Sequence, residues 1–176
     1  MKIKLILGTL CLVGLVGKVD AGVKLVGKPA PLFTAQIVCP DGSVRDFNLK
    51  EYIGNKIVLY FYPMDDTPGC TKQAECFCKN MSRLEAEDII LLGVSCDSVN
   101  SHMKFQKKYS LPYPLISDSR LKRTISKMYG ADGFLFAKRK TYLINTKGIV
   151  FKVFEHITIE NQIDDILNAF KAEKRK

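Results

Sequence analysis

The chain has 176 residues, 47% of them hydrophobic, which is enough for one globular domain with its own core. The net charge is +9, but the basic residues are scattered, apart from residues 138–140 and the C-terminal stretch 171–176. No nucleic-acid-binding motif accompanies them, so we expect a basic surface and no nucleic-acid partner. An anionic surface as a binding partner is the remaining alternative.

The N-terminus has the pattern of a secretory signal peptide. A short positive stretch, residues 1–4, precedes an apolar run at residues 5–17, which is shorter than the roughly 20 residues that span a bilayer. Small residues before Gly22 predict cleavage there, so residues 1–21 are the predicted signal peptide. We expect a secreted or periplasmic protein without a stable membrane span once processed. An uncleaved anchor or a buried first helix is the alternative.

Residues 22–172 are predicted to form a single domain, followed by a basic tail at 173–176. Hydrophobic patterns and turn residues predict strands at 33–39, 43–47, 56–62, 88–95, 111–117, 141–144 and 150–154. They predict helices at 50–53, 67–85, 98–109, 118–129 and 158–171. The first two strands and the last two form hairpins, and Pro114 marks its strand as an edge or an irregular pairing. The order predicts an α/β fold with a mixed central sheet flanked by helices and an N-terminal hairpin.

The cysteine count indicates redox chemistry. Loss of the predicted signal peptide leaves five cysteines: Cys39, Cys70, Cys76, Cys78 and Cys96. An odd number cannot pair completely within one molecule, so at least one thiol is free or intermolecular. A redox-active cysteine explains this pattern better than a purely structural disulfide framework. Cys39, beside a turn, is expected to be inert or paired between molecules.

Cys70 stands where this fold class places functional sites. It follows strand 56–62, and sites in such sheets lie at the carboxyl ends of the parallel strands. Thr67 as cap and Pro68 at the first helical position predict that a helix begins here, so Cys70 falls in its first turn. Unpaired backbone N–H groups and the positive end of the helix dipole favour a thiolate there. A thiolate can attack one peroxide oxygen while nearby donors stabilise the charge that develops on the other.

The segment 61–71 carries the pattern P-x-x-x-T-x-x-C, and on this motif the chain resembles the peroxiredoxins. The longer string 61–74 resembles their bacterioferritin-comigratory, or Q-type, branch, and the likeness spans roughly residues 26–172. It continues through segments 93–98, 101–102, 111–118 and 139–145. The resemblance implies a thioredoxin-like fold. It also implies an antioxidant enzyme that contributes to cell redox homeostasis.

The resemblance further implies a thiol-dependent peroxidase that reduces hydrogen peroxide and organic hydroperoxides through a sulfenic acid on Cys70. A thioredoxin-like dithiol then recycles the enzyme. Carried over residue by residue, Pro63 packs over the thiolate, Thr67 hydrogen-bonds thiolate and peroxide, and Arg139 holds its guanidinium beside the sulfur. No metal, haem or flavin cofactor is implied, and monomers are usual in this branch. Asp65 and the residue after it are interpreted as loop residues before the helix.

The chain departs from this branch at the resolving cysteine. The family commonly places it five residues after the first, where this chain has Glu75. Cys76 lies one residue further, a rise of about 9 Å from Cys70 on an intact helix, whereas a disulfide needs Cα atoms within about 7 Å. Cys76 would therefore require the helix to unwind, while Cys96, at the end of the next strand, is expected to need less unwinding. Cys78 and an external thiol are the remaining candidates for the resolving thiol.

Two other function classes fit the sequence less well. A thiol–disulfide oxidoreductase or carrier of the thioredoxin superfamily would have Cys-x-x-Cys at the helix start, but Thr67 and Gln73 occupy the relevant positions. A non-catalytic copper carrier or chaperone would not need the intact set of Pro63, Thr67, Cys70 and Arg139. Cys76, Cys78 and His102 lack the spacing of a structural zinc site, so we expect no metal.

Overall fold

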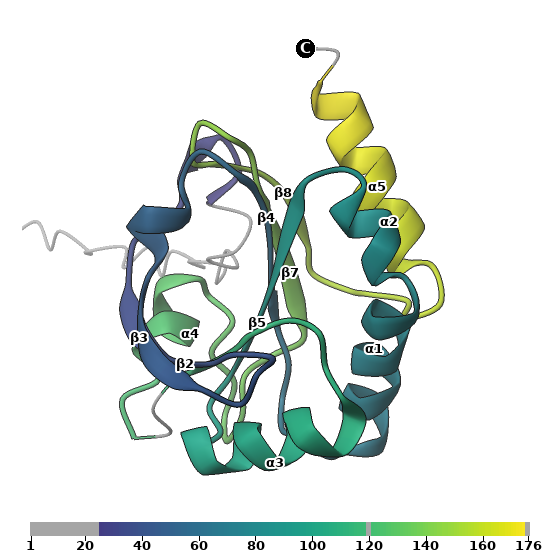
Figure 1. Ribbon diagram of the computed structural model, residues 1–176. Helices are drawn as coiled ribbons and strands as arrows, with labels where there is room; N and C mark the ends of the chain where they lie inside the picture. Colours follow the sequence, from purple (N-terminus) through teal and green to yellow (C-terminus); the bar gives the residue numbers. More distant parts are fainter. Residues whose placement is uncertain (1–24, 119–120, 175–176) are drawn as a thin grey trace, which may run out of the picture.

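A single mixed sheet organises the computed structural model, which describes residues 25–118 and 121–174 (Figure 1). Its strands are β1 (Lys28–Pro29), β2 (Thr34–Val38), β3 (Val44–Asn48), β4 (Lys56–Phe61), β5 (Ile89–Ser95), β6 (Leu115–Ser117), β7 (Lys140–Ile144) and β8 (Ile149–Phe154). They are ordered β1-β8-β7-β4-β5-β6-β2-β3. β4, β5 and β6 run parallel, and the other neighbours are antiparallel. The predicted mixed α/β sheet, the N-terminal hairpin β2–β3 and the hairpin β7–β8 are thereby confirmed.

The helices lie on both faces of this sheet. They are α1 (Pro68–Lys79), α2 (Met81–Glu85), α3 (Val99–Tyr109), α4 (Thr124–Met128) and α5 (Gln162–Glu173), with a 3-10 helix at Leu49–Tyr52. Helices α1, α2 and α5 cover one face, α4 lies on the other, and α3 crosses the lower end of the sheet in Figure 1. No helix in the described ranges is long and apolar enough to cross a bilayer. The predicted signal peptide, residues 1–21, lies outside the described residues.

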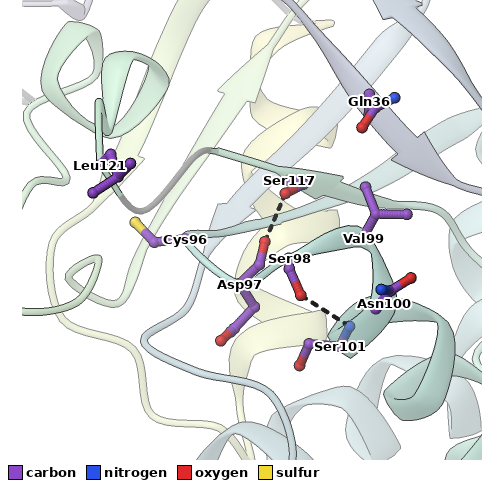
Figure 2. A pocket seen from close by; sticks show the side chains of 9 residues that line it. All are labelled: Gln36, Cys96, Asp97, Ser98, Val99, Asn100, Ser101, Ser117 and Leu121. Atoms are coloured by element: carbon purple, nitrogen blue, oxygen red, sulfur yellow. Dashed lines mark hydrogen bonds between the residues drawn. The ribbon is translucent and has the colours of Figure 1, made fainter.

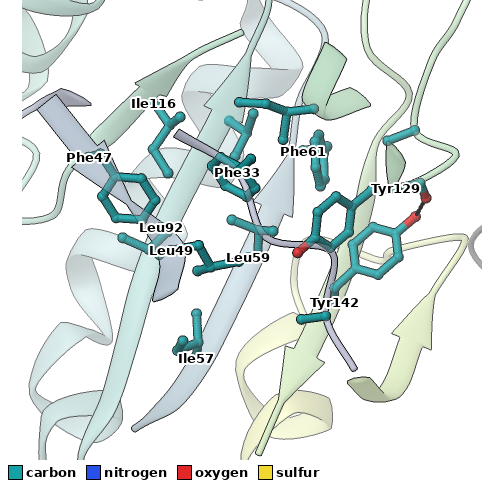
Figure 3. Close-up of a cluster of buried hydrophobic side chains, with 14 of the residues drawn as sticks. Phe33, Phe47, Leu49, Ile57, Leu59, Phe61, Leu92, Ile116, Tyr129 and Tyr142 are labelled. Atoms are coloured by element: carbon teal, nitrogen blue, oxygen red, sulfur yellow. Dashed lines mark hydrogen bonds between the residues drawn. The ribbon is translucent and has the colours of Figure 1, made fainter. Parts of the chain in front are cut away.

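The sheet separates two hydrophobic cores because successive strand residues point to opposite faces. In β4, Ile57, Leu59 and Phe61 enter the core on the α4 side, where Tyr129 and Tyr142 also pack (Figure 3). We call this cluster the α4-side core. The alternate residues Val58 and Tyr60 enter a second cluster that includes Phe77 of α1 and Phe170 of α5. We call it the α1-side core.

The helix predicted at 67–85 is interrupted. At Asn80 the backbone leaves the helical region (φ −117°, ψ 12°), so α1 ends at Lys79 and α2 begins at Met81. The Asn80 side-chain amide donates to the carbonyl of Cys76 at 2.9 Å. Asparagine competes in this way for backbone groups within a helix, which is the physical reason for the break.

The second half of the chain shows three further differences. The helix expected at 118–129 shortens to α4, because the buried carboxylate of Asp118 accepts hydrogen bonds from the amides of Ile125 and Ser126 and caps a later start. β6 lies between β5 and β2, so the edge position considered for it is wrong; Pro114 precedes the strand. The last helix begins at Gln162 instead of 158 and extends one residue into the predicted tail.

Candidate active site

Cys70 lies in the first turn of α1, directly after the loop at residues 63–67 that follows β4, and we call this loop the active-site loop. Thr67 occupies the cap position with extended backbone (φ −91°, ψ 149°), and Pro68 is the first helical residue. The predicted helix start is therefore confirmed. Cys70 is 3% exposed. Its sulfur is thus largely shielded from water at a helix end whose free amides favour negative charge.

The register of the sheet brings Arg139 to Cys70. β7 pairs antiparallel with β4, with Lys140 opposite Phe61, so the residue before Lys140 lies beside the carboxyl end of β4. The Nη2 of Arg139 donates to the Sγ of Cys70 at 3.3 Å. A guanidinium at this distance stabilises a thiolate and any negative charge that develops next to it. Sequence alone would have left Arg139 as one charge in a basic run; the resemblance singled it out.

Gln73 is a functional residue that sequence reasoning missed, because it was considered only as a position lacking a cysteine. It is fully buried on α1, one turn after Cys70. Its Oε1 accepts a hydrogen bond from Nη1 of Arg139, and its Nε2 donates to Oε1 of Gln162 on α5 at 3.0 Å. Gln73 thereby holds Nη1 of Arg139, while Nη2 contacts Cys70. The available signal was a polar residue three positions after Cys70, on the same face of a helix.

Thr67 and Pro63 are both half-buried in the active-site loop. The hydroxyl of Thr67 donates to the carbonyl of Met64 at 3.0 Å and makes no hydrogen bond to its own helix. A hydroxyl has one donor and two acceptor positions, so the Thr67 oxygen keeps its acceptor capacity. In this conformation the Thr67 hydroxyl proton is committed to Met64, so toward a bound peroxide Thr67 can act as an acceptor.

Cys76 and Cys78 are half-buried residues later on the same helix as Cys70. The Sγ of Cys76 donates to the carbonyl of Ile159 at 3.3 Å, in the segment between β8 and α5. Burial raises the pKa of the Cys78 thiol to about 11. Because α1 is continuous from Pro68 to Lys79, neither thiol can reach Cys70 until the helix unwinds.

Cys96 lies on the opposite face of the sheet from Cys70. It follows β5 and packs in the α4-side core, where its Sγ is 3.8 Å from the hydroxyl of Ser126, whereas Cys70 packs in the α1-side core. Burial raises the pKa of Cys96. The expectation that Cys96 needs the smaller rearrangement does not match this placement, because the sheet itself stands between the two sulfur atoms.

An open pocket adjoins Cys96 and not Cys70 (Figure 2). Its lining consists of Gln36, Cys96, Asp97, Ser98, Val99, Asn100, Ser101, Ser117 and Leu121. Neither Cys70, Thr67 and Pro63 of the motif nor Arg139 belongs to it, so this hollow lies apart from the peroxide chemistry. His102, considered above as a metal ligand, bonds through its ring nitrogens to Asp65 and to the carbonyl of Ile116.

Comparisons with known proteins identify the family to which the chain belongs. Residues 26–153 match the model of the AhpC/TSA family. The chloroplastic peroxiredoxin Q of Sedum lineare is 36% identical over 152 residues, which cover 84% of this chain and 78% of that protein. The reduced 2-Cys peroxiredoxin of Plasmodium vivax superposes with a TM-score of 0.77 at 29% identity, covering 86% of this chain and 99% of that one. Peroxiredoxin Q of Xanthomonas campestris gives 0.71 at 27% identity, covering 80% and 90%. The chain therefore belongs to the AhpC/TSA family and is a peroxiredoxin, an enzyme that reduces peroxides with a cysteine thiol.

Proposed function

We propose that Cys70 is the residue at which this thiol-dependent peroxidase reacts with peroxide. The observation that carries the proposal is the Arg139 guanidinium, 3.3 Å from the Sγ of a buried cysteine at a helix start. Cys96, also deeply buried after a strand, packs beside the hydroxyl of Ser126 instead, and burial raises the pKa of its thiol. The charge arrangement thus distinguishes one thiol from the other.

The chemistry follows from these positions. The Cys70 thiolate attacks the terminal peroxide oxygen, the O–O bond breaks, and the thiolate becomes a sulfenic acid. The leaving oxygen takes the electron pair and then a proton from solvent, and departs as water or an alcohol. Arg139 and the first-turn amides stabilise the negative charge as it moves to the leaving oxygen. The Thr67 oxygen accepts the peroxide O–H, and Pro63 limits access of water.

We further propose that Cys76 resolves the sulfenic acid. Its thiol attacks the Cys70 sulfur, water leaves, and a disulfide forms that a thioredoxin-like dithiol reduces. Cys76 shares α1 with Cys70, whereas Cys96 is on the other side of the sheet. The break at Asn80 supports the step, because α1 can unwind without disturbing α2.

Peptide mass spectrometry after one equivalent of hydrogen peroxide tests both steps. The wild type should form a Cys70–Cys76 disulfide. Cys76→Ser should stop at a Cys70 sulfenic acid that dimedone traps, because the attacking thiol is gone. Cys78→Ser is the matched control, since it is half-buried on the same helix, and it should form the disulfide normally. A Cys70–Cys78 or Cys70–Cys96 disulfide in the wild type would assign the resolving role elsewhere.

We also propose that the protein is exported. The support is the pattern of residues 1–21, a short positive stretch followed by an apolar run and small residues. The intact mass of the protein recovered from its native compartment should correspond to a chain that begins at Gly22. A mature chain that still contains residues 1–21 would contradict this proposal.

A monomer is the proposed working form. Arg139 contacts Cys70, Gln73 orients Arg139, and Gln162 bonds Gln73. All of these residues come from the same chain. A partner subunit is therefore not needed to complete the guanidinium network. Sedimentation of the reduced protein at the concentration of the activity assay should give the monomer mass, and a stable dimer there would contradict the proposal.

A further inference from the structure

A buried polar cluster, which the chemistry above does not use, holds the active-site loop. Asp65, in the middle of this loop, is 7% exposed. Its carboxylate accepts from the hydroxyl of Tyr62 at 2.8 Å and lies 2.9 Å from Nδ1 of His102. Its backbone amide donates to the carboxylate of Asp97 at 2.8 Å. Both the side chain and the backbone of Asp65 are thereby tied to groups outside the loop.

His102 connects this loop to two other elements. It belongs to α3, is completely buried, and its Nε2 lies 3.2 Å from the carbonyl oxygen of Ile116 in β6. A carbonyl only accepts, so Nε2 carries a proton. The hydroxyl of Tyr62 also donates to Asp65, so the carboxylate is held from two sides. The contact between His102 and Asp65 is thus a buried hydrogen bond that joins α3 to the active-site loop.

The backbone beside this pair is strained. Asp66 has a φ of +56°, in the left-handed region that residues other than glycine seldom adopt. Its carboxylate accepts from Lys108 at 2.7 Å and from the hydroxyl of Tyr109 at 2.6 Å, both on α3. Such conformations persist only where the surroundings hold them, and they concentrate at active sites. The contacts of Asp66 are exposed and solvent-screened, so the buried Asp65–His102 pair is the stronger of the two anchors.

We infer that Asp65 and His102 are positioning residues for peroxide reduction. They touch no reacting atom. They hold the loop conformation that places the Thr67 hydroxyl next to the first turn of α1, where Cys70 lies. The inference rests on the proposed role of Cys70. Its physical reason is that misplacing a reacting group by about 1 Å can lower a rate by about 100-fold.

The decisive variant is Asp65→Ala, which removes the anchor and leaves no buried donor without a partner. In this variant the Tyr62 hydroxyl, 3.4 Å from Nδ1 of His102, can donate to that nitrogen instead. Asp65→Asn is the conservative variant. Its side-chain amide can bond Nδ1 of His102 while its oxygen still accepts from Tyr62, so the anchor is retained without a carboxylate.

Gln106 provides the matched control. It lies one turn after His102 on the same buried face of α3, is 3% exposed, and donates to the carbonyl of Tyr113 at 2.9 Å. It makes a comparable buried bond from the same helix, but that bond does not reach the active-site loop. Gln106→Leu should therefore reduce stability without altering the rate of the folded protein.

Two rate constants of Cys70 separate positioning from general damage. The first is its oxidation by hydrogen peroxide in a single turnover, which needs the ordered pocket. The second is its alkylation by iodoacetamide, which needs only an accessible thiolate. Asp65→Ala should lower the oxidation rate constant between about tenfold and 100-fold without lowering the alkylation rate constant. Asp65→Asn should restore most of the loss, and Gln106→Leu should match the wild type in both.

The inference is wrong if Asp65→Ala is oxidised at the wild-type rate. It is equally wrong if alkylation falls in parallel with oxidation, or if Gln106→Leu loses as much as Asp65→Ala. Cys70→Ser, measured alongside, distinguishes these outcomes from a failure of the proposed function. If Cys70→Ser still consumes peroxide at the wild-type rate, the assignment of Cys70 itself fails, whatever the loop variants do.

Discussion

Replacing Cys70 with serine should lower the rate of peroxide consumption at least about 10³-fold, the scale of losing a covalent nucleophile. Serine has nearly the same shape, but its hydroxyl stays protonated at neutral pH and is a far weaker nucleophile than a thiolate. The contact with Arg139 cannot compensate, because the guanidinium stabilises an anion and does not create one. Stopped-flow measurement of hydrogen peroxide loss, with the wild type and Cys70→Ser at equal concentration, gives the comparison.

Cys96→Ser is the matched control for that loss. Cys96 is as deeply buried as Cys70, 2% exposed against 3%, so both variants make the same isosteric change in a core. Burial raises the pKa of the Cys96 thiol and outweighs the Ser126 hydroxyl and the Arg123 charge, both of which lower it. Cys96→Ser should therefore consume peroxide at the wild-type rate. Equal losses in the two variants would mean that core damage, and not the loss of one nucleophile, explains the effect.

Arg139→Gln should lower the oxidation rate constant of Cys70 by about 10²- to 10³-fold, the range for removing one preorganised donor from a transition state. The variant removes the positive charge 3.3 Å from Sγ and leaves the buried amide of Gln73 without its guanidinium partner. The measurement is a single turnover with hydrogen peroxide, followed by the loss of free Cys70 thiol. We expect a large effect because bulk water, which would screen the charge, is largely excluded from the buried Cys70 site.

Two further variants make the Arg139 result specific. Lys138→Gln removes a neighbouring exposed charge from the same basic run and should leave the rate unchanged. Arg139→Lys should fall between the wild type and Arg139→Gln. A lysine keeps the charge but lacks the planar fork that reaches Cys70 and Gln73 together. If Lys138→Gln were as slow as Arg139→Gln, the general positive field would be responsible and the direct contact would not.

Local patterns in the sequence predicted the elements that carry the site. The apolar run of β4 and the Thr67–Pro68 start of α1 depend on residues within one or two turns, so they can be recognised without the fold. The ends of elements depend on side chains that compete for backbone groups. Asn80 breaks a helix through a bond to Cys76, and Asp118 caps α4 from seven residues away, so both boundaries differed from the prediction.

The sequence by itself determined that Cys70 stands in the first turn of a helix after a buried strand, because that placement is local. Only the tertiary structure decided which groups meet it. Arg139, 69 residues away, reaches Cys70 through the pairing of β7 with β4, and a different register would direct it elsewhere. In the same way, helix packing decided that Gln73 meets Gln162 and that Asp65 meets His102. The alternation of strand side chains between the two faces also placed Cys96 on the opposite side of the sheet from Cys70. This could be decided only when it was known which helices cover each face.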